Sequence, residues 1–111
     1  MSTQPIYILK SVDELAALIE ASRQGPVLLF KHSLTCPISA RAQEQFVGVD
    51  GAPRYTLAVQ YAKDVSEAVA ERFKTEHASP QLLVIENGEV TGELTHSQIK
   101  GEAVAALLAE K

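Results

Sequence analysis

Short apolar runs alternate with amphipathic segments along this chain, and this alternation limits the possible folds more than any other feature of the sequence. Residues 6–9, 27–31 and 55–61 are rich in β-branched, aromatic or leucine side chains, which is typical of buried strands. In the segment that follows each run, apolar residues recur every three or four positions, as on one face of a helix. Such an order predicts parallel strands joined by helical crossovers.

Local signals set the limits of these elements. Ser11 and Glu14 form a capping-box pattern, in which each side chain accepts a hydrogen bond from the other's backbone N–H, so a helix is expected to begin there. The pair Gly25-Pro26 ends that helical segment before the second strand. We expect Asp64 to cap the helix that carries the apolar positions 65–73.

The last third of the chain has a different pattern. Two strand-like runs, 81–85 and 89–94, are joined through Asn87-Gly88, a dipeptide that favours a tight hairpin turn. A final amphipathic segment at 100–108 predicts a closing helix. The complete order predicts an α/β protein of thioredoxin-like fold, with a central mixed β-sheet flanked by helices on both faces.

Size and charge exclude several functions. A chain of 111 residues with 46% hydrophobic residues predicts a single domain over residues 1–111 with an ordinary core. Its net charge of −4 is unfavourable for binding nucleic acid or an anionic membrane surface. Since no secretory leader and no apolar run of about 18 residues is visible, we expect a cytoplasmic protein.

The chain has a single cysteine, Cys36, at the predicted junction of the second strand and the second helix. With Cys36 as N-cap, Pro37 occupies the first helical position, where a missing N–H costs nothing. The backbone N–H groups of Ile38 and Ser39 and the helix dipole then stabilise a thiolate. Cysteines in such positions have pKa values lowered from ~8.5 to roughly 3.5–7.5.

The residue three positions after Cys36 is Ser39, so no second thiol can close an internal disulfide. This predicts monothiol exchange, in which Cys36 takes a small thiol from a mixed disulfide and an external thiol clears it, while Ser39 donates a hydrogen bond to the sulfur. The alternative is a buried structural cysteine. The polar, cationic segment 31–35 before Cys36 favours an exposed corner and a reactive thiol.

Further polar residues are candidates for the substrate site. Lys31, His32, His77 and His96 could donate hydrogen bonds or charge to an anionic or sugar-bearing thiol. We predict no metal site, because Cys36 and the three histidines lack the short ligand spacing of zinc motifs.

Two segments carry a family resemblance: Thr35-Cys36-Pro37-Ile38-Ser39 and His77-Ala78-Ser79-Pro80-Gln81. Together they resemble the monothiol bacilliredoxins, the YtxJ family of thioredoxin-like proteins, and the similarity extends over nearly the whole chain. The resemblance implies removal of bacillithiol from S-bacillithiolated client proteins in the cytosol. Bacillithiol would act as co-substrate, without a tightly bound cofactor.

The same resemblance assigns roles to individual residues. It implies that Cys36 is the nucleophile and that Pro80 is a cis-proline facing it. Ser79 would offer backbone groups to an extended substrate, and Thr35 belongs to the motif around the cysteine. Pro37, Ser39 and Pro80 therefore complete the expected catalytic set.

Two other functions remain open from the sequence. One is an iron–sulfur carrier of the monothiol glutaredoxin type, in which the cysteine and an external thiol would share a cluster between two chains. Pro37 in place of a flexible glycine counts against it. The other is a non-catalytic thioredoxin-like interaction module, for which the thiol of Cys36 would be unreactive at neutral pH.

Overall fold

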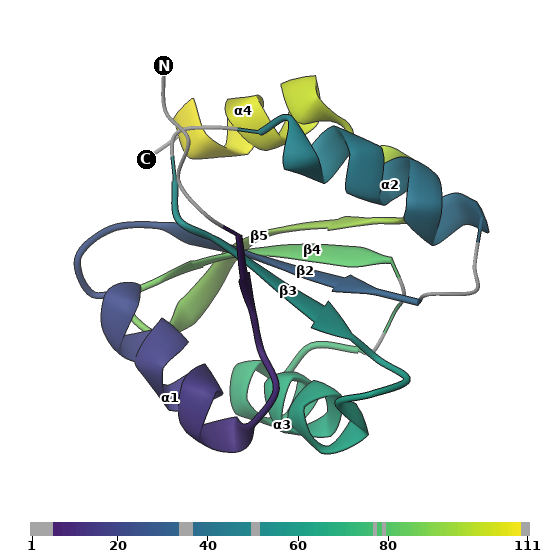
Figure 1. Ribbon diagram of the computed structural model, residues 1–111. Helices are drawn as coiled ribbons and strands as arrows, with labels where there is room; N and C mark the ends of the chain where they lie inside the picture. The colour runs from purple at the N-terminus through teal and green to yellow at the C-terminus, as the bar shows by residue number, and fades with distance from the viewer. Residues whose placement is uncertain (1–5, 34–36, 50–51, 77, 79, 110–111) are drawn as a thin grey trace.

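A five-stranded mixed sheet forms the centre of the molecule (Figure 1). The computed structural model describes residues 6–33, 37–49, 52–76, 78 and 80–109. The elements in chain order are β1 (Ile6–Ile8), α1 (Val12–Ala21), β2 (Val27–His32), α2 (Pro37–Val47), β3 (Arg54–Ala58), α3 (Lys63–Phe73), β4 (Gln81–Glu86), β5 (Glu89–Thr95), the 3₁₀ turn η1 (His96–Gln98) and α4 (Gly101–Ala109).

The strands are ordered β1-β3-β2-β4-β5. β3 pairs in parallel with both β1 and β2, whereas β4 pairs antiparallel with β2 and with β5. This arrangement confirms the predicted α/β class, the thioredoxin-like fold and the mixed sheet. It also places the carboxyl end of β2 beside the amino end of β4, since Lys31 is the register partner of Gln81.

Helices cover both faces of the sheet, α1 and α3 on one and α2 and α4 on the other (Figure 1). The alternation of side chains along each strand divides the interior into two cores. The core under α1 and α3 includes Leu18, Leu29, Val69 and Leu83. The core under α2 and α4 includes Leu28, Phe30, Phe46, Leu82 and Val104. The strand that leads toward Cys36 in the sequence is buried along its whole length.

Several local predictions are confirmed. The Ser11 hydroxyl accepts the Glu14 N–H at 3.2 Å, as expected of an N-cap. Pro37 is the first residue of α2. Asn87 and Gly88 have φ values of 53° and 75° and join β4 to β5, as a type I′ hairpin turn requires.

Other local predictions are wrong. The Glu14 carboxylate accepts from the N–H of Lys10 rather than from that of Ser11, at 2.6 Å. Asp64 does not cap α3: the N-cap is Ala62, which makes no side-chain cap bond, and Asp64 lies in the first turn. There its carboxylate still interacts favourably with the helix dipole, so the sequence signal was one of charge and not of capping.

The third strand is shorter than the predicted run 55–61. It ends at Ala58, whose carbonyl accepts the N–H groups of Tyr61 and Ala62 at 3.1 Å and so turns the chain into α3. Residues 59–61 keep the composition of a strand but lie in this turn, and the N–H of Val59 still donates to the carbonyl of His32 in β2. The 3₁₀ turn η1 had no counterpart in the sequence pattern.

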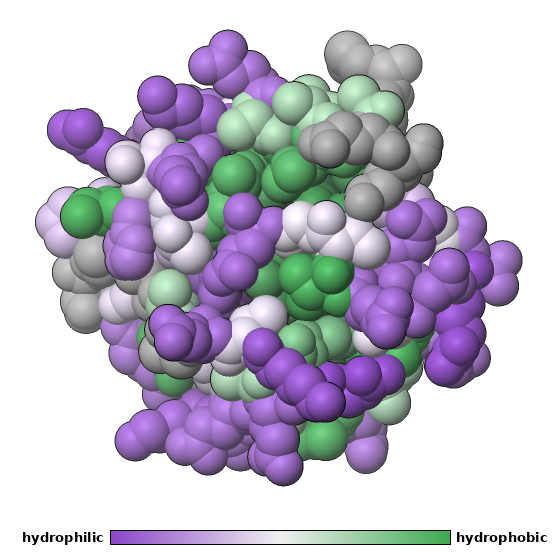
Figure 2. Space-filling model, turned by 180° about the vertical axis from the view of Figure 1, so that it is seen from behind, coloured by the Kyte–Doolittle hydropathy of each residue, from purple (hydrophilic) through white to green (hydrophobic). Residues whose placement is uncertain are grey.

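The surface seen from behind is mainly polar, with apolar residues showing among the polar ones (Figure 2). Apolar residues gather near the top of this view, the level at which Figure 1 shows α4. No helix in the described part of the chain is long and apolar enough to cross a membrane.

Candidate active site

The first turn of α2 is fixed to the end of β2 by a side-chain hydrogen bond. The Oγ of Ser39 accepts the backbone N–H of Ser33 at 3.1 Å, and Ser39 is buried. Pro37 is exposed at the first helical position. The first turn of α2 contains no acidic residue, so no side chain of that turn repels an anion at this helix end.

A second set of bonds ties the same end of β2 to the turn after β3. The N–H of Val59 donates to the carbonyl of His32 at 3.0 Å, and the Nε2 of Gln60 donates to the Oγ of Ser33 at 2.7 Å. The residues on both sides of 34–36 are therefore anchored by hydrogen bonds. Thr35 and Cys36 themselves lie outside the described residues, as do His77 and Ser79.

His32 lies inside the core under α2 rather than on an exposed corner. Only 6% of the residue is accessible, and its ring stacks on Phe30 with centroids 5.3 Å apart. Burial lowers the pKa of His32, so its imidazole is neutral at neutral pH. A direct charge interaction of His32 with a bound anion is therefore unfavourable.

Lys31 is also buried, on the opposite face of the sheet. It follows Val27 and Leu29 in the alternation of β2, and both of these belong to the core under α1 and α3. Burial lowers the pKa of Lys31 to about 8, against the opposing influence of the Glu93 carboxylate. The cationic segment expected to be exposed thus begins with two buried strand residues, because strand β2 extends through His32.

The structure brings Pro80 and His96 together at the neighbouring strand ends. Pro80 is buried immediately before β4, and its carbonyl accepts the N–H of His96 at 3.0 Å. His96 has a φ of 52°, a left-handed conformation that non-glycine residues seldom adopt. The side chain of Gln98 accepts the N–H of Thr95 at 3.0 Å and closes this turn.

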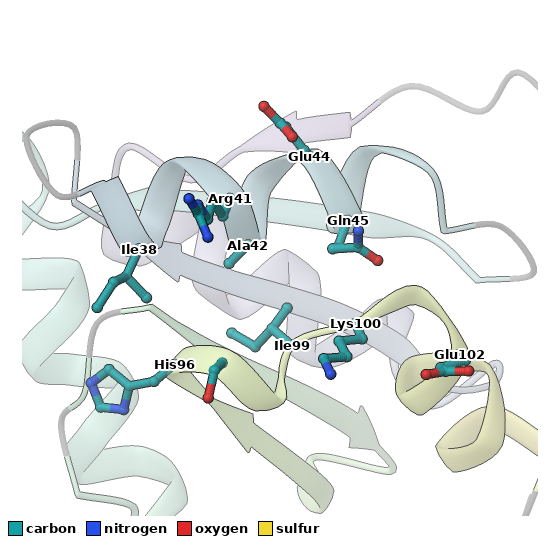
Figure 3. Close-up of a pocket in the computed structure, with 10 residues that line it drawn as sticks. Ile38, Arg41, Ala42, Glu44, Gln45, His96, Ile99, Lys100 and Glu102 are labelled. Atoms are coloured by element: carbon teal, nitrogen blue, oxygen red, sulfur yellow. The ribbon is translucent and has the colours of Figure 1, made fainter.

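A groove of about 790 Å³ separates α2 from η1 and the start of α4 (Figure 3). Ile38 of α2 and His96 of η1 lie on opposite sides of one end of it, and Ala42 and Ile99 lie between the two walls. Its other lining residues are Arg41, Glu44, Gln45, Ser97, Lys100 and Glu102. The groove begins two positions after Cys36 in the sequence and offers an apolar floor with charges of both signs.

Of the residues predicted for the substrate site, His96 lines this groove, whereas Lys31 and His32 do not. Sequence reasoning missed the part played by Gln45, whose Oε1 accepts the N–H of Gly101 at 2.9 Å and joins the two walls. The helical spacing of Ile38, Ala42 and Gln45 marks one face of α2. Nothing in the sequence indicated that the 3₁₀ turn would form the facing wall.

Comparison with known proteins agrees with this geometry. The model of the family described as monothiol bacilliredoxin BrxC matches residues 7–104. A solved structure described as a candidate oxidoreductase with a thioredoxin fold is 33% identical, covers 92% of each chain and superposes with a TM-score of 0.85. Thioredoxins of Malassezia sympodialis and Schistosoma mansoni are 12% and 18% identical, with TM-scores of 0.78 and 0.76; they match 99% of this chain and cover 93% and 98% of theirs.

The fold and the cysteine-bearing strand–helix junction define a thiol-disulfide oxidoreductase of the thioredoxin-like class. Within that class, the chain belongs to the monothiol bacilliredoxin family.

Proposed function

We propose that this protein removes bacillithiol from S-bacillithiolated client proteins, with Cys36 as the nucleophile. The observation that carries the proposal is the family match over residues 7–104, which spans both the Cys36 segment and the Pro80 segment. Support comes from the start of α2 at Pro37 and from its first turn without acidic residues, where the N–H groups favour an anion.

The reaction needs one protein sulfur and two external thiol species. The Cys36 thiolate attacks the bacillithiol sulfur of the mixed disulfide, a Cys36–bacillithiol disulfide forms, and the client thiolate leaves and takes up a proton. A second thiolate then attacks the bacillithiol sulfur, which releases a small disulfide and regenerates the Cys36 thiolate. Because Ser39 stands where a second cysteine would be needed, the enzyme cannot complete this second step alone.

We assign the part of bacillithiol beyond its sulfur to the groove between α2 and η1. The groove begins at Ile38, close in sequence to the nucleophile, and carries the cations Arg41 and Lys100, which suit an anionic, sugar-bearing thiol. His96 stands at the same end as Ile38. Since the cycle requires free thiols, we propose a reducing compartment, the cytoplasm, as its location.

The test is mass spectrometry of the protein after incubation with a client peptide that carries either bacillithiol or glutathione. We expect an adduct of bacillithiol on Cys36, release of the free peptide, and slower transfer of glutathione. Cys36→Ser should form no adduct and release no peptide. Ser39→Cys should release bacillithiol again, because positions 36 and 39 are one helical turn apart and the new thiol can resolve the adduct.

Two results would contradict the proposal. One is wild-type protein that forms neither adduct. The other is a brown, sulfide-containing dimer on anaerobic purification, which would favour a cluster carrier.

A further inference from the structure

Three polar side chains from three adjacent strands meet on the sheet face covered by α1 and α3. Lys31 of β2 and Gln81 of β4 are register partners, and both are fully buried. Glu93 of β5 is exposed at the edge of the sheet and reaches Gln81 with its carboxylate. The reaction proposed above assigns no part to Gln81 or Glu93.

Gln81 makes two hydrogen bonds with one nitrogen. Its Nε2 donates to the Oε2 of Glu93 at 2.6 Å and to the backbone carbonyl of Glu76 at 3.0 Å. Glu76 lies five positions before Gln81, so this side chain ties together the two ends of the stretch that contains Pro80. The carbonyl of Pro80 is held in addition by the N–H of His96.

The electrostatics of this cluster do not favour stability. Burying an ammonium group is costly, and an apolar side chain in place of a buried charge is often neutral or stabilising. The exposed carboxylate of Glu93 interacts favourably with the charge of Lys31. Among the residues that the structure describes, no donor reaches the buried Oε1 of Gln81. A fully buried amide with an unsatisfied oxygen, at the strand ends of the candidate active site, therefore calls for a role other than packing.

We propose that Gln81 is a positioning residue that holds Pro80 in place for thiol exchange, with Glu93 as the anchor of its amide. This inference rests on the proposed function and on the place that the family resemblance implies for Pro80, facing Cys36. Loss of the bridge lets Pro80 shift relative to Glu76, and misplacement by about 1 Å can slow a reaction on the order of 100-fold.

The first test compares two rates in Gln81→Met, which keeps the length of the side chain but removes its donor. We expect kcat/KM for release of bacillithiol from a client peptide to fall at least about tenfold. Iodoacetamide should alkylate Cys36 at a rate within about twofold of wild type, because alkylation needs no alignment against Pro80. The pH at which this rate is half-maximal should be unchanged. A merely structural defect would change both rates together.

The second test uses Glu93, which is exposed and can be truncated with little risk to folding. Glu93→Ala should reduce kcat/KM severalfold, while Glu93→Gln keeps an acceptor oxygen and should restore most of it. Glu89→Ala is the matched control, since Glu89 is an exposed glutamate on the same strand and should leave kcat/KM unchanged.

The third readout does not depend on activity. Amide exchange of the His96 N–H, measured by NMR, should accelerate at least fivefold in Gln81→Met, because its acceptor is the Pro80 carbonyl. If the wild-type protein is active and Gln81→Met has the same kcat/KM, the inference is overturned. Unchanged amide exchange at His96 in Gln81→Met would also overturn it. Inactive wild-type protein with accelerated exchange in the variant would instead overturn the proposed function.

Discussion

A fully buried lysine on the strand before the active-site segment makes the stability of this protein depend on pH. Burial disfavours the ammonium form of Lys31 and lowers its pKa from 10.5 to about 8. In the unfolded chain the same lysine keeps its proton up to about pH 10.4. Between these values the unfolded state binds more protons than the folded state, so the free energy of unfolding rises with pH.

We therefore expect the wild-type protein to become more stable between pH 8 and pH 10, by roughly 2 kcal/mol. Above that window burial of Tyr55 acts in the opposite direction, since it raises the pKa of the phenol in the folded state. Urea unfolding at a series of pH values, in a Cys36→Ser background without thiol titration, measures the effect. Lys31→Met should abolish the rise, whereas Lys63→Met, at an exposed lysine, should keep it.

For single residues, the sequence predicted backbone geometry better than side-chain burial. Pro37 could be assigned to the first position of a helix because its fixed φ and missing N–H fit few other places. Lys31 and His32 were expected at an exposed corner, because cationic residues are rarely buried. Only the pairing of β2 with strands on both sides shows that these two residues are interior.

Between elements, one serine joins the end of α1 to the distant hairpin of β4 and β5. Ser22 is fully buried at the C-cap of α1, and its hydroxyl donates to the carbonyl of Ile19 at 2.5 Å. The same oxygen accepts the N–H of Gly88 at 2.9 Å, and the carbonyl of Ser22 accepts the N–H of Asn87 at 2.8 Å. The hairpin turn is thus capped by a helix that lies far from it in the sequence.

Ser22→Ala should lower the free energy of unfolding by about 1–3 kcal/mol, because the Gly88 N–H then remains buried without an acceptor. Chemical denaturation checks the magnitude, and amide exchange should show the largest change at Gly88. Ser97→Ala is a matched control at an exposed serine and should change stability by less than about 0.5 kcal/mol. Equal losses in the two variants would contradict this role of Ser22.

The helices and strands themselves were largely predictable from the sequence, since in each longer segment the apolar residues recur with a single spacing. The hairpin followed from Asn87-Gly88 alone, because few dipeptides accept two positive φ angles. The groove was less predictable. One of its walls is the short turn at His96, which has no periodic pattern and is stabilised by its contact with Pro80 and by the side chain of Gln98.

In the whole molecule, the sheet separates two cores that differ in their relation to the active site. The core under α2 and α4 contains a row of rings: Phe46 packs on Phe30 at 5.0 Å, and Phe30 packs on His32 at 5.3 Å. This row runs from within α2 to the end of β2 at the candidate active site. The core under α1 and α3 contains Lys31, Leu18 and Leu29 but does not support α2 directly.

Damage to one core should therefore affect thiol exchange more than damage to the other. Leu18→Ala is expected to lower the free energy of unfolding by about 2–5 kcal/mol, and Phe46→Leu by about 1–3 kcal/mol. At a temperature where both variants are fully folded, Phe46→Leu should slow thiol exchange severalfold, because α2 and the groove shift against β2. Leu18→Ala should retain the wild-type rate despite its larger loss of stability.

The NMR titration of His32 gives a second measurement. The lowered pKa of His32 should move toward its ordinary value in Phe46→Leu, because the row of rings loosens and admits water. In Leu18→Ala the pKa of His32 should stay unchanged. A rate that followed stability alone in both variants would show that the two faces of the sheet act as one unit.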